Sequence, residues 1–131
     1  MDERCVLAIE HDWRLRKLIQ ANLEPFGLEV RAAVNALHSL DLLQWIQPDL
    51  ILVDTDLPDM EFTHLLDRIQ AQLDGPVPIL VLCADPPSRQ LRHNGHAISF
   101  LQKPFAIPAL LLYVRQALGD MPHEARRAAD G

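Results

Sequence analysis

The chain has 131 residues, of which 49% are hydrophobic and 23% are charged, a balance that excludes an intrinsically disordered protein. With 12 basic and 18 acidic residues its net charge is −6, so we expect no direct binding to nucleic acid or to an anionic membrane. No apolar run is long enough to span a bilayer, and two cysteines make no disulfide framework, so we expect a single cytoplasmic domain.

Short apolar runs bounded by turn-forming residues recur along the chain, as is typical of buried strands. We therefore predict five strands, in chain order at residues 5–9, 28–34, 50–53, 79–83 and 98–101. The second strand is less apolar than the others, so it is expected at an edge of the sheet.

Segments with apolar residues at helical spacing follow each of these strands. We predict helices at residues 13–23, 36–47, 62–73, 86–95 and 107–118; the fourth of these is short and polar. Asp12 and Asn35 are the expected N-caps of the first two helices, and Pro48 ends the second. The core-facing residues of these two helices are expected to be Leu15, Leu18, Ile19, Leu23, Leu37, Leu40, Leu43 and Ile46, with Trp13 and Trp45 packing beside them.

Five strand–helix units in regular alternation predict an α/β domain, in which a parallel sheet carries helices on both faces. The units end near residue 118, so the predicted domain covers 1–118. Residues 119–131 are polar and aperiodic and are expected to form a tail or linker.

Charged side chains follow several of the predicted strands. Glu10 follows the first strand, Asp54 and Asp56 follow the third, and Lys103 follows the fifth. In parallel sheets of this kind ligands bind outside the carboxyl ends of the strands. Grouped carboxylates suit a divalent cation such as Mg²⁺, and a lysine beside them suits phosphoryl oxygens. These residues therefore indicate a metal-assisted phosphoryl site with an aspartate as the candidate nucleophile.

With these residues, the chain resembles the receiver domains of two-component response regulators. The resemblance extends from about Cys5 to Leu118, and its motifs are Val6-Leu7-Ala8-Ile9-Glu10, Pro48-Asp49-Leu50-Ile51-Leu52-Val53-Asp54, Pro78-Ile79-Leu80-Val81-Leu82-Cys83-Ala84 and Phe100-Leu101-Gln102-Lys103-Pro104-Phe105. The resemblance implies a flavodoxin-like (βα)5 fold, a three-layer sandwich with strand order 2-1-3-4-5.

The resemblance also implies site residues. Asp54 would be the phosphoacceptor, and Mg²⁺ would be held by Asp54, the leading acid Glu10 and the backbone carbonyl of Asp56. Lys103 would bind the phosphoryl group, and Pro104 after it would form a cis or otherwise rigid turn. Cys83 stands where the family has a hydroxyl that binds the phosphoryl group, and Phe100 stands at the aromatic switch position.

The expected partners follow from the same resemblance. A sensor histidine kinase or a phosphotransfer protein would supply the phosphoryl group, and an output domain or partner protein would receive the signal. Two copies can pair through the face of the family's fourth helix, fifth strand and fifth helix. The chain would be a phosphoacceptor and not an enzyme, beyond self-catalysed phosphotransfer and autodephosphorylation.

Several positions depart from the family pattern. His11 replaces an acidic metal ligand, which predicts weaker Mg²⁺ binding and better tolerance of Mn²⁺ unless Asp12 helps. The thiol of Cys83 is a weak hydrogen-bond donor. Asp59 and Phe62 occupy loop positions where the family often has glycine, and the segment 86–95 is shorter than the family's fourth-helix region.

Two alternative functions remain open at this point. A pseudo-receiver would bind its partner without being phosphorylated; His11, Cys83 and the short segment 86–95 favour it, whereas the intact Glu10, Asp54 and Lys103 favour an active receiver. The segment Asp54-Thr55-Asp56 also resembles the motif of haloacid-dehalogenase-type phosphatases, in which the first aspartate is the nucleophile and the second a general acid. In that motif a Thr or Val stands where this chain has Pro58.

Overall fold

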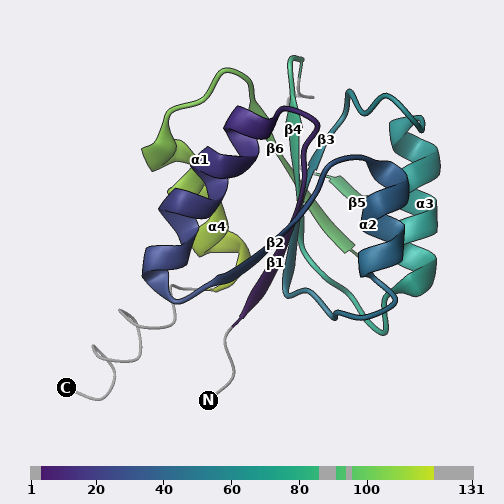
Figure 1. Ribbon diagram of the computed structural model, residues 1–131. Coiled ribbons are helices and arrows are strands. Elements are labelled where there is room, and N and C mark those ends of the chain that lie inside the picture. The colour runs from purple at the N-terminus through teal and green to yellow at the C-terminus, as the bar shows by residue number, and fades with distance from the viewer. Residues whose placement is uncertain (1–3, 86–90, 94–95, 120–131) are drawn as a thin grey trace.

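Strands and helices alternate around a central sheet that carries helices on both faces (Figure 1). The computed structural model describes residues 4–85, 91–93 and 96–119. The strands are β1 (Cys5–Ile9), β2 (Glu29–Ala33), β3 (Leu50–Asp54), β4 (Ile79–Cys83), β5 (Leu91–His93) and β6 (His96–Gln102). The helices are α1 (Trp13–Leu23), α2 (Ala36–Leu42), α3 (Phe62–Gln72) and α4 (Ile107–Ala117), with a short 3₁₀ turn η1 (Glu24–Phe26) after α1.

The strand order in the sheet is β2-β1-β3-β4-β6-β5. The first five strands in this order are parallel, and β6 is the fifth strand of the sequence prediction. The predicted three-layer α/β fold with order 2-1-3-4-5 is therefore confirmed, as is the edge position of β2. Parallel pairing brings the carboxyl ends of these strands to one edge of the sheet, at the top of Figure 1.

Two apolar cores lie on opposite faces of the sheet, because successive side chains of a strand point to opposite faces. Leu7 and Ile51 pack with α2 and α3, whereas Val6 and Leu52 pack with α1 and α4. All residues of β1, β3 and β4 are buried. Each fully buried leucine, isoleucine or valine contributes roughly 1.5–3 kcal/mol, which makes these three strands the stable centre of the domain.

The helices begin where the sequence predicts. The Asp12 carboxylate accepts a hydrogen bond from the Arg14 amide at 2.9 Å, and the Asn35 side chain accepts one from the His38 amide at 2.8 Å. Helix α2 ends at Leu42, earlier than predicted, because its last amide hydrogen bonds tighten into a turn. None of the helices in the described ranges is long and apolar enough to cross a membrane.

Four residues expected to pack in or beside the core are exposed. Trp13 is 56% exposed and Trp45, which lies beyond the end of α2, is 77% exposed. Leu18 and Leu37 are also exposed, because each stands about a quarter of a turn or more from the buried stripe of its helix. Instead of packing in the core, the Trp13 ring lies under the cationic groups of Arg14 and Lys17, at 5.5 and 5.8 Å from its centroid.

The polar helix predicted for residues 86–95 is wrong where the structure describes this segment. Residues 91–93 form β5, which pairs antiparallel with β6 and adds a sixth strand at the sheet edge. The rest of the predicted helix, residues 86–90 and 94–95, lies outside the described residues, as do residues 120–131 of the expected tail. A strand of three residues is too short to show a hydrophobic period, so only pairing with β6 reveals it.

Candidate functional site

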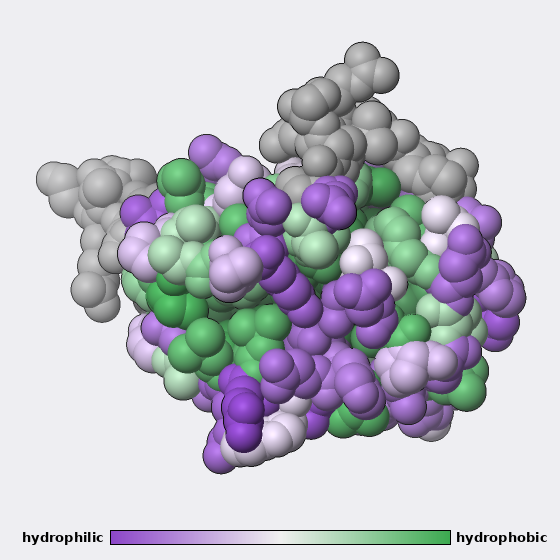
Figure 2. All heavy atoms as spheres, turned by 90° about the horizontal axis from the view of Figure 1, so that it is seen from above, coloured by the Kyte–Doolittle hydropathy of each residue, from purple (hydrophilic) through white to green (hydrophobic). Residues whose placement is uncertain are grey.

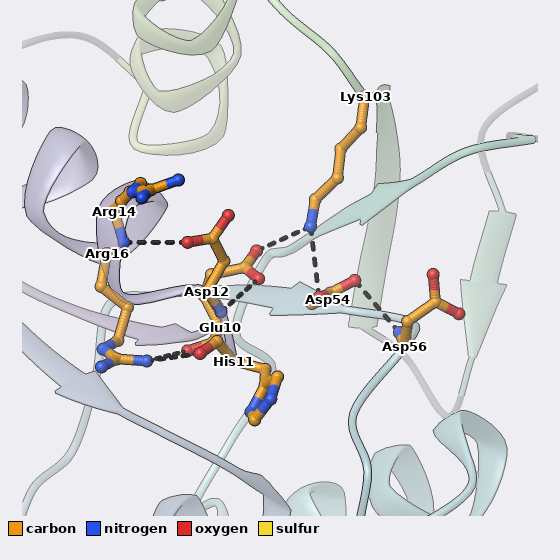
Figure 3. Close-up of polar contacts among 8 residues, drawn as sticks. All are labelled: Glu10, His11, Asp12, Arg14, Arg16, Asp54, Asp56 and Lys103. Carbon is orange, nitrogen blue, oxygen red and sulfur yellow. Dashed lines mark hydrogen bonds and ion pairs between the residues drawn. The ribbon is translucent and has the colours of Figure 1, made fainter.

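Three of the predicted site residues come together at the carboxyl ends of the strands. The Lys103 ammonium lies 2.9 Å from a carboxylate oxygen of Glu10 and 3.2 Å from one of Asp54 (Figure 3). Glu10 directly follows β1, Asp54 is the last residue of β3, and Lys103 directly follows β6. Residues that are 93 positions apart in the chain thus form one ion-pair cluster because their strands are neighbours or near neighbours in the sheet.

Backbone amides hold both carboxylates in place. The second oxygen of Glu10 accepts a hydrogen bond from the Asp12 amide at 3.2 Å. The second oxygen of Asp54 accepts one from the Asp56 amide at 3.0 Å. The Lys103 amide donates to the carbonyl of Cys83 at 2.8 Å, which ties the lysine to the neighbouring strand. All three charged groups are therefore fixed by the ends of the strands that carry them.

The site carries excess negative charge in a buried setting. Glu10 is 1% exposed and Asp54 4% exposed, and one ammonium faces both carboxylates. Burial raises the pKa of Glu10, and the neighbouring Asp54 carboxylate raises it further against the opposing hydrogen bond from Lys103. Burial by itself would lower the pKa of Lys103, but its pairing with Glu10 and Asp54 outweighs burial and raises that pKa.

The raised pKa of Glu10 predicts a specific dependence of stability on pH. Its proton is bound more tightly in the folded chain, so this contribution to stability is full below the ordinary pKa of 4.5 and is lost as pH rises through the folded pKa. Each tenfold difference in proton affinity corresponds to about 1.4 kcal/mol. The advantage of the wild-type chain over Glu10→Gln in free energy of unfolding should therefore shrink between pH 4.5 and 7, measured by urea denaturation.

Asp59→Asn provides the control for this pH measurement. Slight burial raises the pKa of Asp59, but hydrogen bonds from the Leu37 and Ala36 amides outweigh it and lower that pKa. The stability that Asp59 contributes is therefore present above its ordinary pKa of 3.8 and is lost only at lower pH. Parallel stability curves for the wild type and Glu10→Gln across pH 4.5 to 7 would contradict the prediction for Glu10.

The donor set is of the kind that binds Mg²⁺. Mg²⁺ commonly takes one or two carboxylates and completes its shell with water and phosphate oxygens. Glu10 and Asp54 supply two carboxylates, and the Asp56 backbone lies in the loop that directly follows. Within the described ranges, no three side chains of His, Cys, Asp or Glu form a group that could hold a metal ion on their own. A cation here would therefore depend on backbone, water and phosphoryl oxygens as well.

His11 and Asp12 are placed differently from the two carboxylates. The exposed His11 side chain points away from Lys103 and Asp54 (Figure 3). One carboxylate oxygen of Asp12 caps α1 through the Arg14 amide. The Arg16 guanidinium donates hydrogen bonds to the backbone carbonyls of Glu10 and His11 at 2.8 and 2.9 Å, and so holds the loop between β1 and α1 in place. Sequence reasoning missed Arg16, because an arginine within a helix matches no motif that would have marked it.

Cys83, Phe100 and Pro104 lie on β4, on β6 and directly after Lys103, respectively. Cys83 is buried at the end of β4, and burial together with Asp85, Asp54 and Asp56 raises the pKa of its thiol. Both cysteines of the chain are free. Phe100 is half-buried and packs against the core that faces α2 and α3. The peptide bond between Lys103 and Pro104 is cis.

An open groove of about 610 Å³ lies beside Lys103. Its lining residues are Asp12, Arg14, Leu15, Leu18, Lys103, Pro104 and Phe105. Figure 2 views this end of the molecule, where hydrophilic side chains cross the middle and hydrophobic ones lie on both sides of them. The cluster of charges therefore adjoins a surface that a partner molecule can reach.

Comparisons with known proteins show the family of this chain. Residues 6–115 match the family model of the response regulator receiver domain. The chain is 32% identical to the DNA-binding dual master transcriptional regulator RpaA of Synechocystis over 86% of its length, and 30% identical to the transcriptional regulatory protein CseB of Streptomyces coelicolor over 93%. It spans 48% and 52% of those two proteins.

A solved structure shows the same fold. The signal receiver domain of an HD domain-containing protein from Pseudomonas fluorescens is 27% identical to this chain and superimposes with a TM-score of 0.76. The match covers 90% of this chain and 96% of that structure. The family match, over residues 6–115, extends over the strands that carry the charged cluster.

Proposed function

Because this chain belongs to the receiver domain family of two-component response regulators, we propose that Asp54 accepts a phosphoryl group from a histidine kinase or a phosphotransfer protein. Phosphorylation would switch a partner protein or an output domain. The observation that carries the proposal is the cluster of Glu10, Asp54 and Lys103, in which a buried carboxylate lies beside a fixed ammonium.

The chemistry follows from the contacts of Asp54. A carboxylate oxygen attacks the phosphorus of a phosphohistidine, the P–N bond breaks, and the donor imidazole leaves with the bonding electrons. The Lys103 ammonium, 3.2 Å from Asp54, is placed to neutralise charge on the phosphoryl oxygens. The groove beside Lys103 gives the donor protein access to this side of the site.

Mg²⁺ would be held by Glu10, Asp54 and the backbone carbonyl of Asp56. When bound, it supplies charge neutralisation during transfer of the phosphoryl group. With His11 directed away from the cluster, this chain would supply one carboxylate fewer than the family pattern, so weak affinity is expected and Mn²⁺ should serve as well.

Phosphoryl uptake by the purified chain tests the proposal. The chain would be incubated with acetyl phosphate, or with beryllofluoride as a phosphoryl mimic, in the presence of Mg²⁺ or Mn²⁺. Intact mass spectrometry should show one added phosphoryl group, and peptide mapping should place it on Asp54. If neither metal supports an adduct, the chain is a pseudo-receiver that binds its partner without phosphorylation.

A phosphatase activity has less support. The family match spans residues 6–115, so it includes the segment Asp54-Thr55-Asp56, in which Asp54 ends β3 and the other two residues begin the loop after it. The Asp56 side chain is exposed and directed away from Asp54 (Figure 3), whereas a general acid must reach the leaving group. We therefore propose a phosphoacceptor with no turnover of phosphate esters.

Replacing Cys83 by threonine should strengthen phosphoryl binding. Cys83 ends β4 next to the strand of Asp54, and a hydroxyl is a better hydrogen-bond donor than a thiol. One neutral hydrogen bond contributes about 1 kcal/mol, so beryllofluoride affinity should rise about fivefold, measured by calorimetric titration. Cys5→Ala, at the opposite end of the sheet, is the control and should leave the affinity unchanged. Equal affinities for Cys83→Thr and the wild type would contradict this role of Cys83.

A further inference from the structure

Asp59 joins two loops that are distant in sequence. Its carboxylate oxygens accept hydrogen bonds from the Ala36 and Leu37 amides, each at 2.9 Å. These amides belong to the first turn of α2, where backbone N–H groups have no partner within the helix. The Asp59 side chain, from the loop after β3, therefore caps the N-terminus of α2, the helix that follows β2.

Asp59 lies beyond the carboxyl end of β3, and the amides that it binds lie beyond the carboxyl end of β2. Two loops at the edge of the sheet that carries the charged cluster thus meet at one carboxylate.

The loop after β3 is held at several points. At its start the Asp56 amide donates to Asp54, and the Leu57 side chain is buried in the core that faces α2 and α3. Asp59 adds the next attachment, three residues beyond Asp56. Asp56 therefore lies between the phosphoacceptor strand and the attachment to α2.

We propose that Asp59 is a positioning residue, which by clamping its loop to the start of α2 fixes the backbone of Asp56 against Asp54. This inference rests on the proposed function, because that backbone supplies an amide to the phosphoacceptor and a carbonyl to the cation. Loss of the hydrogen bonds from Asp59 to the start of α2 would loosen the loop after β3 at the backbone of Asp56, which the site uses. Asp59 acts through the backbone of Asp56 and touches neither phosphoryl group nor cation.

Asp59→Ala and Asn35→Ala, each in the full chain, separate clamping from helix capping. Asn35 also caps the start of α2, through the His38 amide at 2.8 Å, but its side chain makes no described contact with the loop after β3. Both variants should lower the urea midpoint of unfolding. Only Asp59→Ala should speed hydrogen exchange at the Asp56 amide and weaken Mg²⁺ affinity about tenfold, measured by calorimetric titration with MgCl₂. Asp59→Asn keeps one acceptor oxygen and should fall between Asp59→Ala and the wild type.

The outcomes distinguish this inference from the proposed function. Equal exchange rates at the Asp56 amide in Asp59→Ala and Asn35→Ala would overturn the clamp, because Asp59 would then only cap α2. Exchange is measured without a cation, so it tests the clamp even if the wild-type chain takes up no phosphoryl group. Absence of phosphoryl uptake by the wild-type chain would instead overturn the proposed phosphoacceptor function.

Discussion

Replacing Asp54 by asparagine is expected to abolish uptake of a phosphoryl group from acetyl phosphate, with a loss of at least ~10³-fold in rate. The neutral amide oxygen is a far weaker nucleophile than a carboxylate, and among the described residues Glu10 is the one other carboxylate shown paired with Lys103. The variant should fold, because Glu10 keeps its ion pair with Lys103 at 2.9 Å. Intact mass spectrometry after incubation measures the uptake, and circular dichroism checks the fold.

Asp56→Asn is the matched control for this prediction. It changes a carboxylate to an amide two residues away, but the Asp56 side chain is exposed and directed away from Asp54 (Figure 3). The amide of Asp56 that donates to Asp54 is backbone and is kept. This variant should take up the phosphoryl group at nearly the wild-type rate. Equal labelling of Asp54→Asn and Asp56→Asn would show that the phosphoryl group is attached to a residue other than Asp54.

Replacing Lys103 by methionine is expected to lower the free energy of unfolding at pH 7 by about 2–4 kcal/mol. The change keeps the length of the side chain but leaves Glu10 and Asp54 buried together without a counter-charge. The lower part of that range applies because the Lys103 side chain is 28% exposed, so water partly screens the ion pairs. Urea denaturation of the variant and the wild type measures the difference.

The double variant Glu10→Gln with Lys103→Met is the control for the charge argument. Removing one of the two carboxylate charges should recover part of the lost stability, so the two changes should be clearly non-additive. Lowering the pH should also recover stability in Lys103→Met, since Glu10 then takes up a proton without losing an ion pair. Additive losses at pH 7 would contradict the view that unpaired buried charge causes the destabilisation.

Local sequence patterns were sufficient for most of the secondary structure. The apolar runs at Cys5–Ile9 and Ile79–Cys83 form strands with the predicted bounds. A strand that is buried on both faces appears in the sequence as a continuous apolar run, so it can be identified without knowledge of the strands beside it. Asp12 and Asn35 cap the helices that follow them, because a capping side chain and its amide lie within three residues of each other. The strand–helix alternation predicted a parallel sheet, and the family resemblance implied the order of its strands.

Patterns read along the chain failed where a residue's partner is distant or its burial depends on neighbouring elements. The short strand β5 exists through its pairing with β6, and Trp13 is exposed although it begins an amphipathic helix. The bonds from Asp59 to the start of α2 join residues 22 and 23 positions apart, and no motif marks them. A long-range hydrogen bond contributes as much as a local one, but it leaves no periodic trace in the sequence.

For the site, the sequence alone determined which charged residues stand at the carboxyl ends of the strands, because Glu10, Asp54 and Lys103 each lie within two residues of the end of an apolar run. Only the tertiary structure decided how those residues meet: that one ammonium lies between two buried carboxylates, and that His11 is directed away from them. The physical reason is that a strand's position follows from its own apolar residues. The direction and pairing of a side chain instead depend on the charges and amides that the neighbouring loops bring to it.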